Sequence, residues 1–349
     1  MAAAGVTESK RMDLHIFWFA TLGVLLIGYA ILDGFDLGVG ILHLGARSDE
    51  ERRIFMNSIG PLWDGNEVWL VTFGGALFAA FPGAYATAFS AFYLPLVLVL
   101  FALIFRAVSL EFRSKHESRA WRRFWDCTFF GGSALATFLF GVAVGNVMQG
   151  IPVGPDREFT GTFLGLLTPF PLLVGALTVA TIAMHGAIYL HLKTEGELQQ
   201  RIHGWMWRAF GFFLVFYLLA TIYTLVQLPA ATANFHDMPL AWAVVLLNVL
   251  AIANIPRAIH HGRPFYAFLS SAAVIAALAF LFGMALFPNL IVSSLGPEYN
   301  LTIYNVASSE KTLRIMRLIA FLGMPFVLAY TTVIYWIFRG KVRLGQFSY

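Results

Sequence analysis

The chain has 349 residues, of which 59% are hydrophobic, 16% aromatic and only 12% charged, with a formal net charge of +4. Soluble proteins carry about 25% charged residues, so this composition excludes a water-soluble domain and predicts an all-α polytopic membrane protein. The single cysteine excludes an internal disulfide and a multi-cysteine metal site within this sequence. The positive charge does not indicate nucleic-acid binding, because excess Lys and Arg in a membrane protein mostly reports topology.

Nine segments are long and apolar enough, or nearly so, to cross a membrane core about 30 Å thick. The seventh segment is the shortest, and only the turn signal "FPGAY" separates the second from the third. We see no sequence repeat or flexible linker, so we expect one transmembrane domain over residues 1–349. The predicted spans are 15–44, 60–81, 84–110, 125–149, 163–192, 206–228, 239–256, 265–288 and 313–338.

Lysine and arginine are distributed unevenly between the two sides of this predicted bundle. Sixteen of the 23 follow spans 1, 3, 5 and 7 or lie in the C-terminal segment, whereas six lie on the opposite side. The positive-inside rule therefore places the N-terminus outside and the C-terminus in the cytoplasm. The remaining basic residue, Arg106, lies inside the third span. It either pairs with a buried acid or extends to the cytoplasmic interface.

Two pairs of acidic residues lie in the first two spans, within "GYAILDGFDLGVG" (28–40) and "NSIGPLWDGNEVW" (57–69). Each pair has i,i+3 spacing, so its carboxyls share one helix face about 5–6 Å apart at Cβ. A lipid-facing aspartate costs about 2.5–3.5 kcal/mol, so we expect these groups to face the protein interior or a water-filled path. Carboxyls that repel each other in such a site exchange protons readily. The candidates for a proton path are Asp33, Asp36, Asp64 and Glu67, with Trp63 and Arg106 in support.

Each pair also has a structural interpretation. Asp64 and Glu67 follow Gly60-Pro61, a helix-start signal, and acids in a first turn interact favourably with the helix dipole. Asp33 and Asp36 lie in mid-helix, where the alternative is a structural ion pair, for example with Arg106.

The glycines in these spans predict close packing. Gly34 and Gly38, and likewise Gly141 and Gly145, form faces of small residues at a spacing of four, which let helices approach closely.

The histidines do not predict a metal or haem site. Only His185, in "IAMHGAIYLHL", lies clearly inside a span, and a single such histidine is more often hydrogen-bonded within the bundle than an axial ligand. Nucleotide-binding and HExxH motifs are absent from the sequence. We expect no complete catalytic site in this chain.

Taken together, "GYAILDGFDLGVG" and residues 52–115, which begin "RRIFMNSIGPLWDGNEVW", closely resemble subunit II of the cytochrome bd-type quinol oxidases, including the cyanide-insensitive relatives. "LTIYNVASSEKTL" (301–313) is similar to that family's late motif. The resemblance is dense over residues 20–150 and returns near 286–340.

The resemblance implies a nine-helix, haem-free subunit of the bacterial inner membrane that pairs with a haem-bearing subunit I. The complex oxidises quinol at the outer face and reduces O2 to water with protons taken from the cytoplasm, which generates protonmotive force. It implies haems b and d in the partner and, in some members, a structural quinone. It also implies contacts with membrane lipid and allows a small single-helix accessory subunit. It also implies that Asp64, beside Trp63, and an aspartate of "DGFD" serve a proton path. The alternatives are a proton-coupled secondary transporter and a purely structural assembly subunit.

Overall fold

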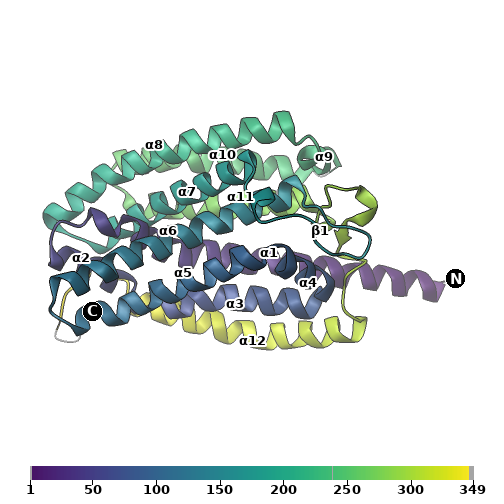
Figure 1. The fold of residues 1–349 in the computed structure, drawn as a ribbon, viewed down its shortest axis with the longest axis horizontal. Coiled ribbons are helices and arrows are strands. Elements are labelled where there is room, and N and C mark those ends of the chain that lie inside the picture. The colour runs from purple at the N-terminus through teal and green to yellow at the C-terminus, as the bar shows by residue number, and fades with distance from the viewer. Residues whose placement is uncertain (1, 238, 346–349) are drawn as a thin grey trace.

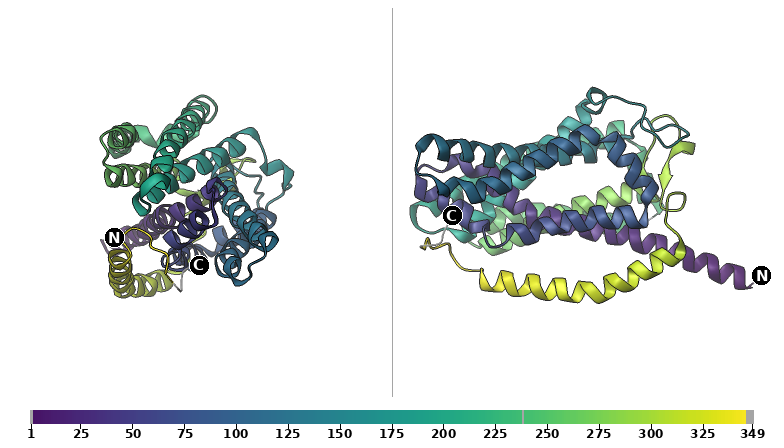
Figure 2. Two further views of the ribbon diagram at one scale, coloured as in Figure 1. Left: turned by 90° about the vertical axis from the view of Figure 1, so that its left-hand side faces the viewer. Right: turned by 60° about the horizontal axis from the view of Figure 1, so that its bottom comes forward.

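The computed structural model describes residues 2–237 and 239–345 and is almost entirely helical, as the composition predicts (Figure 1). Its long helices run side by side along the bundle, and the loops gather at the two ends (Figures 1 and 2). The α-helices are α1 (Ala2–Leu42), α2 (Asp49–Ile59), α3 (Trp63–Ala80), α4 (Pro82–Ala91), α5 (Tyr93–Phe112), α6 (Arg119–Gln149), α7 (Pro169–Lys193), α8 (Gly196–Gln227), α9 (Ala230–Asp237), α10 (Pro239–His260), α11 (Pro264–Leu286) and α12 (Glu310–Ile337).

Two short antiparallel strands, β1 (Asn289–Ile291) and β2 (Leu301–Thr302), lie in the loop between α11 and α12. Short 3-10 turns cover His43–Gly45, Arg113–Lys115, Leu164–Leu166 and Pro297–Tyr299. Helix α2 lies at one end of the bundle, and β1 lies at the other end with the N-terminal part of α1 (Figure 1).

Eight helices in the described part of the chain are long and apolar enough to cross a membrane. Each of these eight helices overlaps one of the predicted spans, and the second predicted span, which corresponds to α3, has no counterpart among them. That helix has 18 residues and begins with the polar stretch "WDGNE", which lowers its hydropathy, so a ninth crossing stays a prediction.

The third predicted span, 84–110, is wrong as one continuous helix, because α4 ends at Ala91 and α5 begins at Tyr93. Pro95 has no amide hydrogen to donate to the carbonyl of Ala91, so the helical ladder is interrupted around Phe92. The turn predicted from "FPGAY" is present, with α3 ending at Ala80 and Pro82 in the first turn of α4.

Helix α7 packs against α1, α6, α8 and α11. A Cβ atom built on Gly38 of α1 would lie 2.3 Å from the carbonyl oxygen of Ile182 and 2.7 Å from the Cα atom of Gly186. In the first turn of α7, a Cβ on Gly145 of α6 would lie 2.6 Å from Cα of Pro171. Both predicted glycine faces therefore meet α7, where the backbones are too close for any side chain.

Helix α12 contrasts with α7, because Leu313 is its only buried residue in the described part of the chain. Its first turn is held by Trp18 Nε1, which donates to the Leu313 carbonyl at 3.1 Å. Its last turn is held by Lys193 of α7, whose ammonium donates to the Phe338 carbonyl. Just beyond the helix, Lys341 donates to the Thr194 carbonyl at 2.6 Å. Helix α12 is thus fastened to the bundle at both ends.

The α1–α7 crossing gives a direct test of packing. We expect Gly38→Ala to destabilise the purified protein by about 1–3 kcal/mol, because the methyl group meets backbone atoms that cannot move without separating the helices. Gly23→Ala is the matched control, since nothing lies within 4 Å of a Cβ at that position of the same helix. The measurement is the midpoint temperature of unfolding in detergent, monitored by fluorescence-detected size-exclusion chromatography. Equal thermal midpoints for Gly38→Ala and Gly23→Ala would contradict the close approach of α1 to α7.

Candidate functional site

The buried charges of the bundle meet where α1, α3 and α5 come together. Asp33 and Asp36 lie one turn apart on α1, Glu67 lies in the second turn of α3, and Arg106 lies on α5. Helix α5 is held close to α6 at this level, because a Cβ on Gly132 would lie 2.4 Å from the Ala102 carbonyl and 3.3 Å from Cβ of Arg106. This close packing fixes the position from which the Arg106 side chain extends.

Arg106 is fully buried and pairs with two carboxylates. Its Nη2 atom lies 2.7 Å from Oδ1 of Asp33, which is also fully buried. Its Nη1 atom lies 3.3 Å from Oδ2 of the same residue and 2.8 Å from Oε1 of Glu67. Of the two alternatives for Arg106, pairing with an acid is therefore confirmed and extension to the interface is wrong. The structural ion pair considered for Asp33 is present.

Asp36 is equally buried but has a different partner. Its Oδ2 atom accepts a hydrogen bond of 2.7 Å from Nδ2 of Asn66, one residue before Glu67 on α3. Its Oδ1 atom has no hydrogen-bond partner within the described residues. The Asn66 side-chain oxygen in turn accepts from the hydroxyl of Tyr335 on α12 at 2.8 Å. A hydrogen-bonded row therefore connects the interior of α1 to α12.

Asp64 does not join this buried group. It is exposed in the first turn of α3, and none of the hydrogen bonds or ion pairs among the described residues involves it. This position fits the helix-dipole interpretation. Glu67 lies one turn further in, with 25% of its side chain exposed. The neighbouring Trp63 packs into the core formed around Phe35 and Tyr189.

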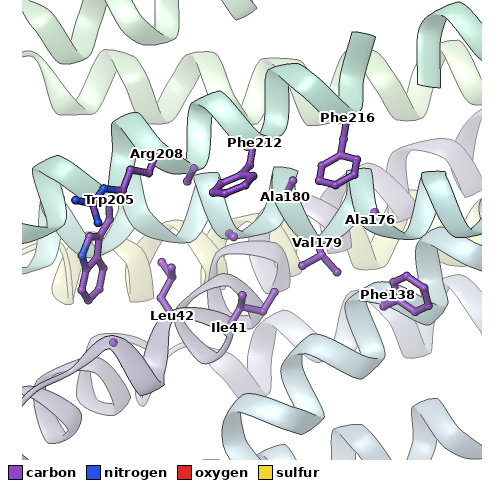
Figure 3. A pocket seen from close by; sticks show the side chains of 13 residues that line it. Ile41, Leu42, Phe138, Ala176, Val179, Ala180, Trp205, Arg208, Phe212 and Phe216 are labelled. Atoms are coloured by element: carbon purple, nitrogen blue, oxygen red, sulfur yellow. The ribbon is translucent and has the colours of Figure 1, made fainter. Parts of the chain in front are cut away.

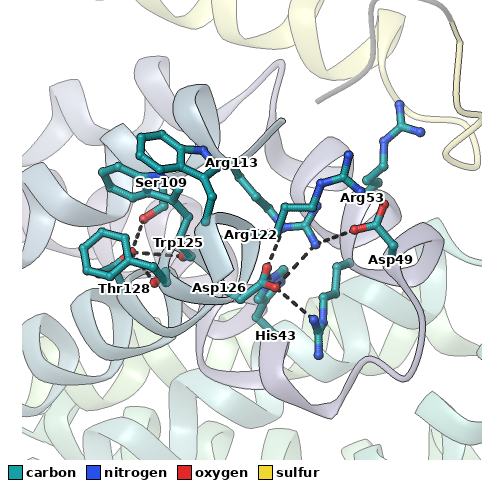
Figure 4. Close-up of polar contacts among 12 residues, drawn as sticks. His43, Asp49, Arg53, Ser109, Arg113, Arg122, Trp125, Asp126 and Thr128 are labelled. Atoms are coloured by element: carbon teal, nitrogen blue, oxygen red, sulfur yellow. Dashed lines mark hydrogen bonds and ion pairs between the residues drawn. The ribbon is translucent and has the colours of Figure 1, made fainter. Parts of the chain in front are cut away.

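A second buried ionic cluster, centred on Asp126 near the start of α6, lies outside the residues expected from the sequence (Figure 4). Its carboxylate, 1% exposed, lies 2.7 Å from His43 Nε2, 2.5 Å from Arg113 Nε and 2.9 Å from Arg52 Nη1. Arg113 also pairs with Asp49 in the first turn of α2 at 2.8 Å. The cluster joins the ends of α1, α5 and α6 to α2, and we interpret it as a fastening of the loop that carries α2.

Glu51, also in the first turn of α2, is the partner of Arg201 from α8. The Arg201 Nη2 atom and the Arg47 backbone N–H donate to the same carboxylate oxygen at 2.7 and 2.6 Å. Partial burial acts to raise the pKa of Glu51, but these hydrogen bonds outweigh it and hold the pKa below its ordinary value of 4.5. The stabilisation is therefore present above pH 4.5 and is lost as the pH falls through the lowered pKa.

His185 is hydrogen-bonded within the bundle, as the sequence predicts. Its Nε2 atom lies 3.1 Å from the Ile31 carbonyl, and its Nδ1 atom lies 2.7 Å from the hydroxyl of Ser271. The ring stacks on Phe268 with centroids 4.7 Å apart. Because both ring nitrogens are engaged, the surroundings of His185 do not fit a haem. No group of three or more metal-ligating side chains occurs within residues 2–237 and 239–345.

Comparisons with known proteins identify the family. Residues 14–338 match the family model described as cytochrome bd terminal oxidase subunit II. The chain is 38% identical to the cytochrome bd-I ubiquinol oxidase subunit 2 of Escherichia coli (strain K12), over 94% of this chain and 95% of that one. It is 34% identical to the cytochrome bd ubiquinol oxidase subunit 2 of Bacillus subtilis (strain 168), over 95% and 97%.

The fold also matches a chain from the structure of the bd oxidase of Geobacillus thermodenitrificans. The TM-score is 0.78 at 16% identity, and the match covers 93% of this chain and 98% of that one. The members of the matched family are subunits of an oxidoreductase complex. The chain therefore belongs to the cytochrome bd terminal oxidase subunit II family and is a multi-pass protein of the bacterial inner membrane.

Proposed function

We propose that this chain is the haem-free subunit of a bd-type quinol oxidase, which supports the haem-bearing subunit I and supplies part of its cytoplasmic proton path. The observation that carries the proposal is the buried carboxyl of Asp36, one oxygen of which has no partner among residues 2–237 and 239–345 and lies near the Arg106 ion pairs. The family match favours this role over a proton-coupled transporter.

The reaction of the complex needs protons that this subunit is placed to provide. Two quinols release four electrons and four protons at the outer face, and one O2 takes up four electrons and four protons to form two water molecules. Haems b and d of subunit I carry the electrons when bound there. In the topology with nine spans and a cytoplasmic C-terminus, the acids of α1 and α3 lie in the cytoplasmic half of the membrane.

The charges around Arg106 do not balance if every acid is ionised. One guanidinium contacts Asp33 and Glu67, and Asp36 lies one turn from Asp33. A buried ionised carboxylate is costly unless it is paired, so the third acid is the one that holds a proton. We place this proton on Oδ1 of Asp36, which makes no other hydrogen bond with the described residues.

The exposure of the acids gives the path an order. Asp64 is exposed and receives protons from water, and Glu67 is partly exposed one turn further in. Asp33 keeps Arg106 in position, and Asp36 holds the exchangeable proton. The Tyr335 hydroxyl donates to Asn66, and the Asn66 amide donates to Asp36, so these bonds position the Asp36 carboxyl and connect it to α12, whose exposed face is available to subunit I.

The role of Asp36 can be tested in the purified oxidase complex. We expect Asp36→Asn to lower quinol-dependent O2 consumption by about tenfold or more, because the amide cannot exchange a proton. Asp36→Glu should retain most of the activity, since it keeps a carboxyl. The haem absorbance of each complex checks assembly, and an Asp36→Asn complex with normal turnover and normal proton uptake in proteoliposomes would remove Asp36 from the path.

Asp64 should have a smaller effect, because water also reaches Glu67 directly. We expect Asp64→Asn to reduce turnover and proton uptake by a factor of about two to five, well below the range of a general acid or base. Asp156→Asn is the matched control, as Asp156 is an exposed acid in the loop after α6. Unchanged oxidase activity and proton uptake in Asp64→Asn would eliminate the role of Asp64 and leave the family assignment untouched.

The Arg106–Asp33 pair favours an assembly role as a second candidate. We expect Arg106→Gln to reduce the yield of intact complex strongly, because an unpaired buried charge costs about 3–5 kcal/mol. The double variant Asp33→Asn/Arg106→Gln removes both charges and should recover yield, measured as haem per milligram of purified complex. Wild-type turnover per haem in the double variant would show that this pair serves assembly alone.

A further inference from the structure

A groove lies between α8 and the helices α1, α6 and α7 (Figure 3). Its volume is about 640 Å³, and its lining is aliphatic and aromatic except for one charged side chain, Arg208. Phe212 and Phe216 of α8 face Phe138 of α6 and Val179 of α7 across it (Figure 3). Phe212 is 65% exposed, so this chain alone leaves a large aromatic surface of α8 uncovered.

The two ends of the groove differ in chemistry. Trp205 and Arg208 lie together at one end, and Phe138 and Phe216 lie toward the other (Figure 3). From Trp205 to Phe216 the helix rises about 16 Å, close to the roughly 15 Å of hydrocarbon in one leaflet. The groove therefore has the length and the lining of a site for one acyl chain.

Arg208 supplies a positive charge at the end of the groove that also holds Trp205. It is exposed, and none of the hydrogen bonds or ion pairs within the described residues involves its guanidinium. It also belongs to the basic side of the bundle, which faces the anionic lipids of the cytoplasmic leaflet. Trp205, which packs near Phe55 with ring centroids 6.1 Å apart, is a residue type enriched at the membrane interface.

We propose that this groove binds an anionic phospholipid, with one acyl chain between α8 and α6 and the headgroup phosphate on Arg208. The acyl chain covers Phe212 and fills the space that separates α8 from α1 and α6. The lipid is then a structural ligand of this subunit, independent of the proton path.

Native mass spectrometry of the purified complex tests the proposal with phosphatidylglycerol as the probe and phosphatidylcholine as the zwitterionic comparison. We expect Arg208→Gln to weaken phosphatidylglycerol binding about fivefold, the effect of one basic residue at a membrane surface. Arg263→Gln is the matched control, since Arg263 is an exposed arginine before α11 that does not line the groove. Equal binding by the two variants, or equal binding of the two lipids to the wild type, would overturn the proposal.

A second variant separates a lipid from a free anion. Ala183→Leu fills the groove from α7 and leaves Arg208 unchanged, so it should weaken phosphatidylglycerol binding as much as Arg208→Gln does. Glycerol 3-phosphate, which has the charge without the chains, should not compete. Competition by glycerol 3-phosphate, unchanged binding in Ala183→Leu, or a co-purified quinone in place of phospholipid would each refute the lipid site. Size exclusion and the haem spectrum confirm that the variants assemble.

Discussion

The arrangement of α1, α3 and α5 depends on one guanidinium in an apolar interior. Arg106 is buried within the bundle, and an unpaired charge there would be prohibitively costly. Asp33 and Glu67 offset that cost and, because they come from α1 and α3, tie three helices together around the ion pairs. The backbone contacts of α7 with Gly38 and Gly145 hold α1 and α6 at the positions from which these side chains meet.

The two ionic clusters have opposite charge balance. Around Arg106, three acids lie near one cation, whereas around Asp126 and Asp49 three arginines, Arg52, Arg113 and Arg122, pair with two acids. The arginines at the edge of the bundle pair with both oxygens of the Asp126 carboxylate, so this acid is not free to exchange a proton. Excess acids in the interior leave one carboxyl oxygen of Asp36 without a partner in the described part of the chain, which is the chemical basis of the proposed proton exchange.

Hydropathy and spacing were sufficient to predict most of this fold. Eight apolar helices of membrane-spanning length, the two glycine faces and the internal hydrogen bonds of His185 follow from local patterns of apolar and small residues. The acids of α1 and α3 were also identifiable, because a charge in a long apolar segment needs an explanation. The break at Phe92 was missed, although Pro95 carries the signal for it.

The partners of these charges were not predictable, because they come from distant parts of the chain. Arg52 and Asp126 are 74 positions apart, and Tyr335 and Asn66 are 269 apart. Arg52 and Arg113 were interpreted as markers of topology, and nothing local distinguishes them from arginines exposed to water. Likewise, nothing in the sequence around Tyr335 indicates that its hydroxyl bonds to Asn66.

Helix α12 is fixed to the bundle at both ends. Trp18 and Lys193 anchor its two extremities, and the Tyr335 hydroxyl is its polar link to the Asp36 row. Tyr335 lies three residues before Phe338, so the anchor by Lys193 also keeps the Tyr335 hydroxyl within reach of Asn66. A partner that covers the exposed middle of α12 therefore leaves this hydrogen bond in place.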